Sequence, residues 1–230
     1  MELIEALRTT PATRSFTSAE VTDETLAEIL DDARFAPSGG NRQGWKVVVL
    51  KDPDIRRSIR DLYLPGWYEY LGQSASSMTP FAPTNDPDAE AAARAMAPAM
   101  QEHGTANPGF AEQLDQVPCL LLVLADLSCL AAVDRDLPRY TFAGGASIYP
   151  FVWSILLSAR SRGLGGVMTT MAVRAESEVL ELVHAPAGMA VAALVAIGEP
   201  SQSVTRLRRS TVSDFSTIDT FDGPRFGQGI

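Results

Sequence analysis

Residues 33–45 combine small residues with side chains that carry paired hydrogen-bonding groups. Pro37, Ser38 and Gly39 follow a helical pattern, and the carboxamides Asn41 and Gln43 come directly after them. Small residues let a planar ligand approach the backbone closely, and a carboxamide offers both a donor and an acceptor to the edge of a heteroaromatic ring. The same residue types are also typical of a helix end followed by a polar turn, and composition alone favours that interpretation.

Familiar catalytic patterns are absent elsewhere in the chain. The sequence has no glycine-rich phosphate motif of the dinucleotide or P-loop type, no nucleophile-elbow serine and no zinc-protease motif. The two histidines, His103 and His184, have no cysteine or carboxylate cluster around them, so we expect no metal site. An enzyme with so little acid–base material would depend on an organic cofactor for its chemistry.

The overall charge excludes several classes of partner. The 230 residues include 19 Lys+Arg and 28 Asp+Glu, a net charge of -9, whereas nucleic-acid binding requires a basic surplus. We therefore expect no nucleic-acid partner and no binding to a membrane surface. No apolar run reaches the roughly 20 residues that cross a bilayer. Two cysteines are too few for a disulfide framework, which favours the cytoplasm.

Periodicity predicts an α+β domain in which helices flank a central sheet. Helical spacing covers residues 22–35, 53–63 and 176–183, and a long apolar helix at 141–162 should kink or break near Pro150. Apolar β-rich runs predict strands at 45–50, 117–125 and 189–197, and a short strand or a loop at 167–171. We expect residues 1–230 to form one domain.

Two segments stand apart from this pattern. Residues 78–117 hold ten alanines, five prolines and six acidic residues, with Arg94 as the one basic residue. This composition predicts a surface insertion with one or two short helices, either a lid or a solvated loop. Residues 199–230 show no strong period and are expected to form an extended C-terminal arm.

Four motifs occur in order along the chain. Arg14-Ser15-Phe16 precedes a V-x-x-E-x-L pattern at residues 21–26, and residues 33–45 read A-R-F-A-P-S-G-G-N-R-Q-G-W. The long apolar helix ends at Gly163-Leu164-Gly165, and Ile197-Gly198-Glu199-Pro200 is followed by a basic tail. Together these motifs resemble the nitroreductase family of FMN-dependent oxidoreductases, with its R-x-F before that helix, its A-x-x-A-P-S-G-x-N-x-Q-P-W signature, its long interface helix and its last strand.

The resemblance implies an α+β homodimer, with a central mixed sheet and one FMN at each end of the subunit interface. The C-terminal arms would wrap around the partner, and the long apolar helix would be covered by the second subunit. Family members use NAD(P)H to reduce the flavin and then pass the hydride to a nitroaromatic, quinone or other small acceptor in a ping-pong cycle. No catalytic side chain beyond the flavin itself is implied.

The resemblance also assigns cofactor contacts along the chain. Arginines near both ends would hold the FMN phosphate, which an acidic protein must balance with a local cationic pocket. Residues after the first helix would flank the isoalloxazine and contact its polar edge or the ribityl chain, and residues after the G-L-G turn would present backbone N–H groups to the flavin N5. The implied set is Arg14, Pro37, Ser38, Gly39, Asn41, Gln43, Met168, Thr169, Thr170, Arg206, Arg208 and Arg209.

Two departures from the family pattern bear on FMN affinity. Pro11 stands where members often carry an additional arginine, and Gly44 replaces the usual proline before tryptophan. The aromatics near the insertion would either stack on an acceptor or serve as packing residues: Tyr63, Trp67, Tyr68, Tyr70 and Phe81. The insertion offers only Arg94 to a nicotinamide 2'-phosphate, which favours NADH.

Other functions fit the same sequence. A specialised flavin enzyme of this fold, such as a reductive dehalogenase or a dehydrogenase of a natural-product intermediate, is one alternative. A non-catalytic protein that stores or senses FMN is another.

Overall fold

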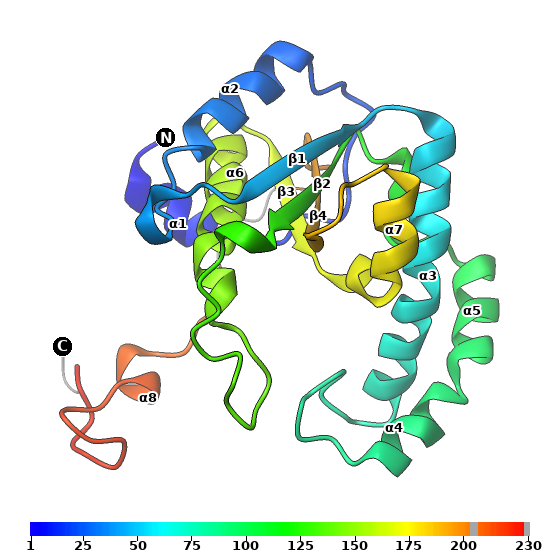
Figure 1. The fold of residues 1–230 in the computed structure, drawn as a ribbon. Helices are drawn as coiled ribbons and strands as arrows, with labels where there is room; N and C mark the ends of the chain where they lie inside the picture. The colour runs from blue at the N-terminus through cyan, green and yellow to red at the C-terminus, as the bar shows by residue number, and fades with distance from the viewer. Residues whose placement is uncertain (203–206, 228–230) are drawn as a thin grey trace.

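The central sheet has four strands, and the two shortest of them form its opposite edges. The computed structural model describes residues 1–202 and 207–227 (Figure 1). The strands are β1 (Trp45–Leu50), β2 (Cys119–Asp126), β3 (Gly165–Thr169) and β4 (Met189–Gly198), in the order β1-β2-β4-β3. All three neighbouring pairs are antiparallel, and parallel pairing in the described residues is limited to one bridge between Ala12 and Gly166.

The central strands β2 and β4 are apolar along nearly their whole length because both of their faces are covered. On β2, Leu121 and Val123 point into a cluster with Ile29 and Ile155, whereas Leu120 and Leu122 point into a second cluster with Ile59 and Val179. A strand that is buried on both sides loses the usual apolar–polar alternation. The result is a three-layer α+β domain, which confirms the predicted class; the sheet implied by the resemblance was mixed, whereas the four strands pair antiparallel.

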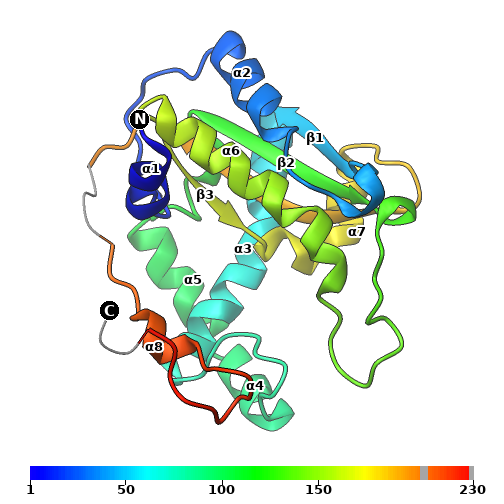
Figure 2. The ribbon, with the colours of Figure 1, turned by 90° about the vertical axis from the view of Figure 1, so that its left-hand side faces the viewer.

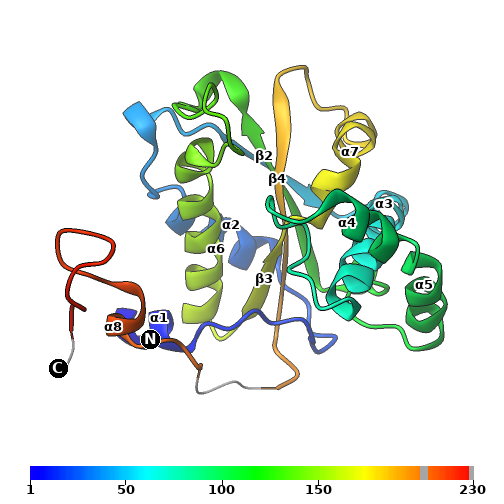
Figure 3. The same ribbon diagram turned by 90° about the horizontal axis from the view of Figure 1, so that it is seen from below.

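Helices cover both faces of the sheet. One face is covered by α2 (Asp23–Ala33) and α6 (Tyr149–Ser161), and the other by α3 (Pro53–Ala75) and α7 (Glu176–Leu182) (Figure 3). A further helix, α1 (Leu3–Thr9), lies beside α6 (Figure 2). The 3-10 turns are η1 (Gly39–Asn41), η2 (Leu114–Gln116), η3 (Leu127–Cys129), η4 (Ala143–Ser147) and η5 (Met171–Ala175).

Two helices differ from their predicted bounds. The helix predicted to end at Tyr63 continues to Ala75 and contains Pro65, so proline did not terminate it. Tertiary packing along both halves of α3 outweighs the single lost hydrogen bond. The predicted break near Pro150 is confirmed, since α6 starts at Tyr149 after η4. Most of α6 is buried by its own chain, and only Tyr149 and Trp153 keep large exposed surfaces.

The insertion packs on the outer side of α3. Its two helices are α4 (Pro87–Arg94) and α5 (Ala97–Ala106), and Asp86 caps α4 by accepting from two backbone N–H groups. Gln73 of α3 is fully buried, and its Oε1 accepts from the backbone N of Phe81 at 2.6 Å. The insertion therefore has the short helices expected, firmly tied to the distal half of α3 (Figure 1).

The C-terminal arm leaves the body of the protein (Figures 1 and 2). It carries α8 (Val212–Phe215), which a reciprocal capping box between Thr211 and Asp214 stabilises. Phe215 is 72% exposed and Phe221 is fully exposed. Throughout residues 1–202 and 207–227, no helix has the length and apolar character needed to span a membrane.

We predict that Gly72→Ala loosens the insertion. A Cβ at residue 72 would lie 2.5 Å from the backbone oxygen of Ala93, so α4 would have to move. Overpacking of this kind costs about 1–3 kcal/mol of unfolding free energy, although alanine is otherwise the better helix former. Urea unfolding and hydrogen exchange across residues 86–106 would measure the loss. Ser74→Ala, at an exposed position of the same helix, is the control and should change neither.

Candidate functional site

Two glycines hold the N-terminal segment against the outer edge of β3. The backbone N of Thr13 donates to the oxygen of Gly166 at 2.9 Å, next to the bridge formed by Ala12. A Cβ on Gly165 would lie 2.5 Å from Thr13 Oγ1, and one on Gly166 would lie 2.8 Å from the oxygen of Ala196. Glycine at residue 165 permits the approach of the N-terminal segment, and glycine at residue 166 permits the close packing of β3 on β4. The contact fixes Arg14, the next residue, beside β3.

Beyond that contact the outer edge of β3 is open. Residues of an antiparallel strand direct their backbone groups alternately toward and away from the neighbouring strand. The oxygen of Gly166 points outward to Thr13, so the N–H of Met168 points outward as well. Within the described part of the chain, neither Met168 N nor Thr170 N donates a hydrogen bond to a backbone group outside the sheet. This edge therefore offers backbone donors to a ligand.

Arg14, Tyr63 and Thr169 form one group at this edge. The hydroxyl of Tyr63, which is 2% exposed, lies 3.0 Å from Thr169 Oγ1. Burial raises the pKa of Tyr63, while the hydrogen bond with Thr169 and the positive charge of Arg14 act in the opposite direction. Arg14 itself is exposed and has no ion-pair partner among the described residues. Its guanidinium is thus free to bind an anion.

Residues 37–43 form a rigid polar loop in front of β1. Ser38 Oγ accepts from the backbone N of Gln43 at 3.0 Å, and the Gln43 amide donates to Asn41 Oδ1 at 3.2 Å. Asn41 and Gln43 have φ values of 53° and 50°, a strained region for residues other than glycine. Gly39 N donates to Ser147 Oγ at 3.0 Å, which ties the loop to the turn before α6. Pro37, the first residue of the loop, is exposed.

Steric constraints explain why residue 44 is a glycine. A Cβ at this buried position would lie 2.7 Å from Cys129 Cβ. Proline, which the family signature has here, would therefore collide with the turn that follows β2. Glycine at residue 44 therefore fits the close packing against the turn that follows β2, next to the exposed amides of Asn41 and Gln43.

The chain does not bring these two groups together. The loop at 37–43 precedes β1, and residues 168–170 end β3, which is the opposite edge of the sheet. Three inter-strand spacings separate the two edges, about 14 Å. Within one chain, the predicted site residues therefore form two separate half-sites.

The C-terminal arginines join neither half-site in the described residues. Arg206 lies outside the residues that the structure describes. Arg208 and Arg209 are exposed on the arm, and the one hydrogen bond formed by their guanidinium groups is from Arg209 Nη1 to the oxygen of Arg208. Their predicted role at a phosphate stays a prediction.

Residue patterns did not indicate the part played by Asp134. This buried carboxylate accepts from Thr141 Oγ1 at 2.6 Å, from the backbone N of Phe142 at 2.9 Å and from Arg139 at 2.8 Å. These contacts, led by that of Thr141, hold the pKa of Asp134 well below its usual range. The loop so ordered leads to Ser147, the partner of Gly39. The hydrogen-bond partners of Asp134 follow no helical or strand period, so no sequence pattern predicted its role.

The aromatic residues of α3 divide into two kinds. Tyr63 and Tyr68 are 2% and 4% exposed and serve as packing residues. Trp67 and Tyr70 are half-buried, and their rings stack at 5.2 Å with planes 9° apart. Phe81 lies under the guanidinium of Arg174 at 4.9 Å. Trp67 and Tyr70 thus form an aromatic wall on the face of α3 that carries Tyr63.

No group of three or more histidine, cysteine or carboxylate side chains suited to a metal ion occurs in residues 1–202 and 207–227. Cys119 is buried and Cys129 half-buried, both as free thiols, and burial raises the pKa of Cys119 to about 11.

The chain is similar in sequence to named proteins. A NADH dehydrogenase of Thermus thermophilus is 27% identical over 189 residues, which covers 82% of each chain. Iodotyrosine deiodinase 1 of Mus musculus is 34% identical over 61 residues, and this segment spans only 21% of that protein.

A solved structure shares the fold over almost the whole chain. Iodotyrosine deiodinase bound to FMN and 3-iodo-L-tyrosine superposes with a TM-score of 0.65 at 20% identity, covering 96% of this chain and all of that one. The model of the nitroreductase family matches residues 7–199, which include both half-sites. The chain therefore belongs to the nitroreductase family, a family of flavin-dependent oxidoreductases.

Proposed function

We propose that this protein is an FMN-dependent oxidoreductase that uses NAD(P)H to reduce nitroaromatic or quinone-like acceptors in a ping-pong cycle. One observation carries the proposal: Arg14, free of ion-pair partners in the described residues, lies beside the open edge of β3 with the outward N–H of Met168. A cation and backbone donors side by side suit a cofactor with an anionic tail and an electron-accepting ring.

Each part of this edge has a role in the proposal. Arg14 would bind the phosphate, supplying the local positive charge that a chain of net charge -9 otherwise lacks. The N–H groups of Met168 and Thr170 would stabilise negative charge on the ring, and Tyr63 would hold Thr169 in place. FMN, when bound, supplies hydride transfer from the nicotinamide to the acceptor. Trp67 and Tyr70 would pack against a planar acceptor.

We infer that two chains complete the site. The loop at 37–43, with Asn41 and Gln43 exposed, lies before the edge strand opposite β3 of its own chain and would meet β3 of a second copy. Exposed apolar residues on α1, on α6 and along the arm offer the surface for such a contact: Leu3, Ile4, Trp153, Phe215 and Phe221. The proposed unit is a cytoplasmic homodimer, with Arg206, Arg208 and Arg209 brought to the phosphates by the arms.

A second candidate is a specialised flavin enzyme such as a reductive dehalogenase. It is favoured by the likeness to the deiodinase bound to FMN and 3-iodo-L-tyrosine, both in fold and in a local segment. The two functions share cofactor and half-sites and differ in the acceptor.

We predict that the purified protein is yellow and releases FMN on denaturation. Anaerobic NADH should bleach it, and a nitroaromatic or a quinone should restore the colour, as followed by flavin absorbance. Reoxidation only by a halogenated phenol would favour the second candidate, and a flavin that neither NADH nor NADPH bleaches would indicate a binding protein. A colourless protein that does not take up added FMN would refute all of these functions.

Arg14→Ala should weaken FMN retention. Loss of a charge-assisted hydrogen bond costs about 1.5–3 kcal/mol, or roughly 10- to 150-fold in Kd. Fluorescence titration of the apoprotein with FMN gives the constant. Arg57→Ala is the matched control, because Arg57 lies on α3 and pairs with Asp54 away from either half-site, and it should leave Kd unchanged. An equal loss in both variants would remove Arg14 from the site.

Mixed dimers should reveal a site shared between chains. Arg14→Glu damages one half-site and Gly39→Glu obstructs the other, so each homodimer should lose FMN. A heterodimer of the two variants, purified through two tags, carries one site with both defects and one intact site. We expect it to hold about half of the wild-type FMN. If both half-sites served one chain, the heterodimer would hold no more than either parent.

A further inference from the structure

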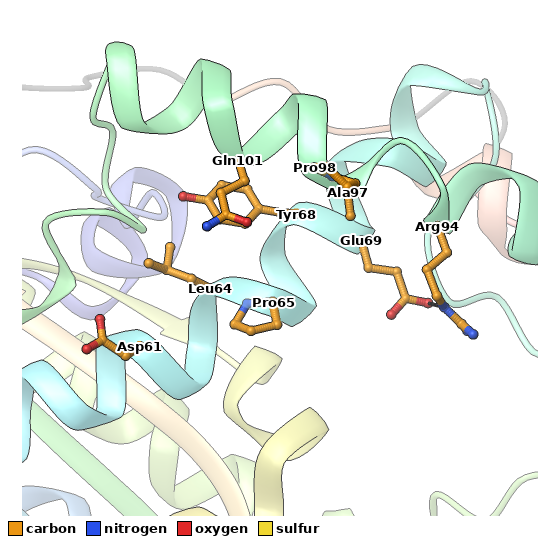
Figure 4. A pocket seen from close by; sticks show the side chains of 9 residues that line it. All are labelled: Asp61, Leu64, Pro65, Tyr68, Glu69, Arg94, Ala97, Pro98 and Gln101. Carbon is orange, nitrogen blue, oxygen red and sulfur yellow. Dashed lines mark hydrogen bonds and ion pairs between the residues drawn. The ribbon is translucent and has the colours of Figure 1, made fainter.

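A cleft lies between α3 and the insertion. It has a volume of about 530 Å³, within the range of roughly 300–1,000 Å³ that is typical of small-molecule sites. Leu64 and Pro65 of α3 form its apolar floor, and Ala97 and Pro98 at the start of α5 face them (Figure 4). Polar side chains stand at both ends. The cleft has the size and the mixed lining of a ligand site.

The cleft is separate from the half-site at β3. Asp61, Pro65 and Tyr68 line the cleft at a spacing of four and three residues, so they share one stripe of α3. Tyr63 and Trp67 lie on another stripe, rotated by about 140° at 100° per residue. Tyr63 contacts Thr169, so that stripe faces β3. A ligand in the cleft would contact none of the residues proposed to hold FMN.

One end of the cleft carries an excess of positive charge. Glu69, whose side chain is 10% exposed, accepts from Arg94 Nε at 2.9 Å, and Arg174 Nη2 lies 3.6 Å from its other oxygen. Two guanidinium groups thus share one carboxylate. Arg94 is 57% exposed, and its terminal nitrogens donate to no group among the described residues. These donors suit a carboxylate or sulfonate on a ligand.

The other end offers hydrogen-bond acceptors. Pro65 has no N–H, so the carbonyl of Asp61, four residues earlier, lacks its usual partner within the helix. The Asp61 carboxylate is paired with Arg60, and Gln101 of α5 stands opposite (Figure 4). Eight residues of helix separate Asp61 from Glu69, about 12 Å. A ligand that spans the cleft would be elongated and would donate a hydrogen bond at this end.

We propose that this cleft is a second binding site, for an elongated amphipathic carboxylate. The carboxylate would bind Arg94, the apolar body would lie between Pro65 and Ala97, and an N–H or O–H at the far end would donate to the Asp61 carbonyl. An aryl carboxylate that carries a hydroxyl group at the far end of its ring system has this chemistry. The site requires nothing of the flavin function and stands or falls independently of it.

Calorimetric titration with 4'-hydroxybiphenyl-4-carboxylate tests the proposal. This probe has a carboxylate at one end, an apolar ring system and a phenolic O–H at the other end, and its methyl ester is the uncharged control. The acid should bind at least about tenfold more tightly than the ester, because it alone makes a charge-assisted contact with Arg94. Equal binding of acid and ester, or binding of neither, would overturn the proposal.

Three variants locate the binding. Ala97→Trp should fill the cleft and abolish binding, whereas Ala99→Trp, an exposed residue of the same helix that does not line the cleft, should leave it intact. Arg94→Met should remove the preference for the acid, and Arg94→Lys, which keeps the charge beside Glu69, should retain part of it. Circular dichroism and FMN content verify the fold and the distant half-site. Unchanged binding in a folded Ala97→Trp protein would place the probe elsewhere.

Discussion

The order of the sheet is the constraint on which the rest of the structure depends. β1 and β3 occupy opposite edges, and the two strands between them are the most deeply buried part of the chain. Leu121, Val123 and Leu194 have no exposed surface, and each buried side chain of this kind contributes about 1.5–3 kcal/mol. Bringing the two half-sites together within one chain would mean opening this core. Pairing with a second copy costs none of it, which is the physical basis of the proposed shared site.

Close packing at Gly165 and Gly166 has a second effect, on electrostatics. It holds Ala12 and Thr13 along β3 but leaves the end of the strand at Met168 uncovered. Arg14 therefore lies next to backbone N–H donors at that end. Pro11 stands just before this segment, where the family often has another arginine, so Arg14 is the one basic residue between α1 and α2. In a chain of net charge -9, this places one positive charge at the point where an anion would bind.

Sequence patterns predicted the elements whose packing is repetitive. The strands β2 and β4 and the break before α6 followed from apolar runs and from Pro150, because burial on two faces leaves a strong local signal. The helix α1 and the continuation of α3 past Pro65 were missed, since contacts with distant residues stabilise them. The family motifs assigned Arg14 and Thr169 to one site. They did not predict that Asn41 lies at the opposite edge of the sheet, because strand order is not encoded in local periodicity.

The helix α3 shows why the insertion matters to the fold. A helix on the surface of a sheet normally has one apolar stripe and one solvated stripe. Here two glycines on different stripes each allow a close contact: Gly66 meets Met171 and Arg174 near β3, and Gly72 meets the backbone of Ala93 in the insertion. The insertion therefore covers the side of α3 that would otherwise face solvent. Between the tight contact at Gly72 and the sheet, the ring of Pro65 leaves both a gap in the helical hydrogen bonds and an apolar surface. A cleft there follows from the packing itself. The close contact at Gly72 sets the distance between α3 and α4, and α5, which follows α4 in the chain, is held at that distance from α3.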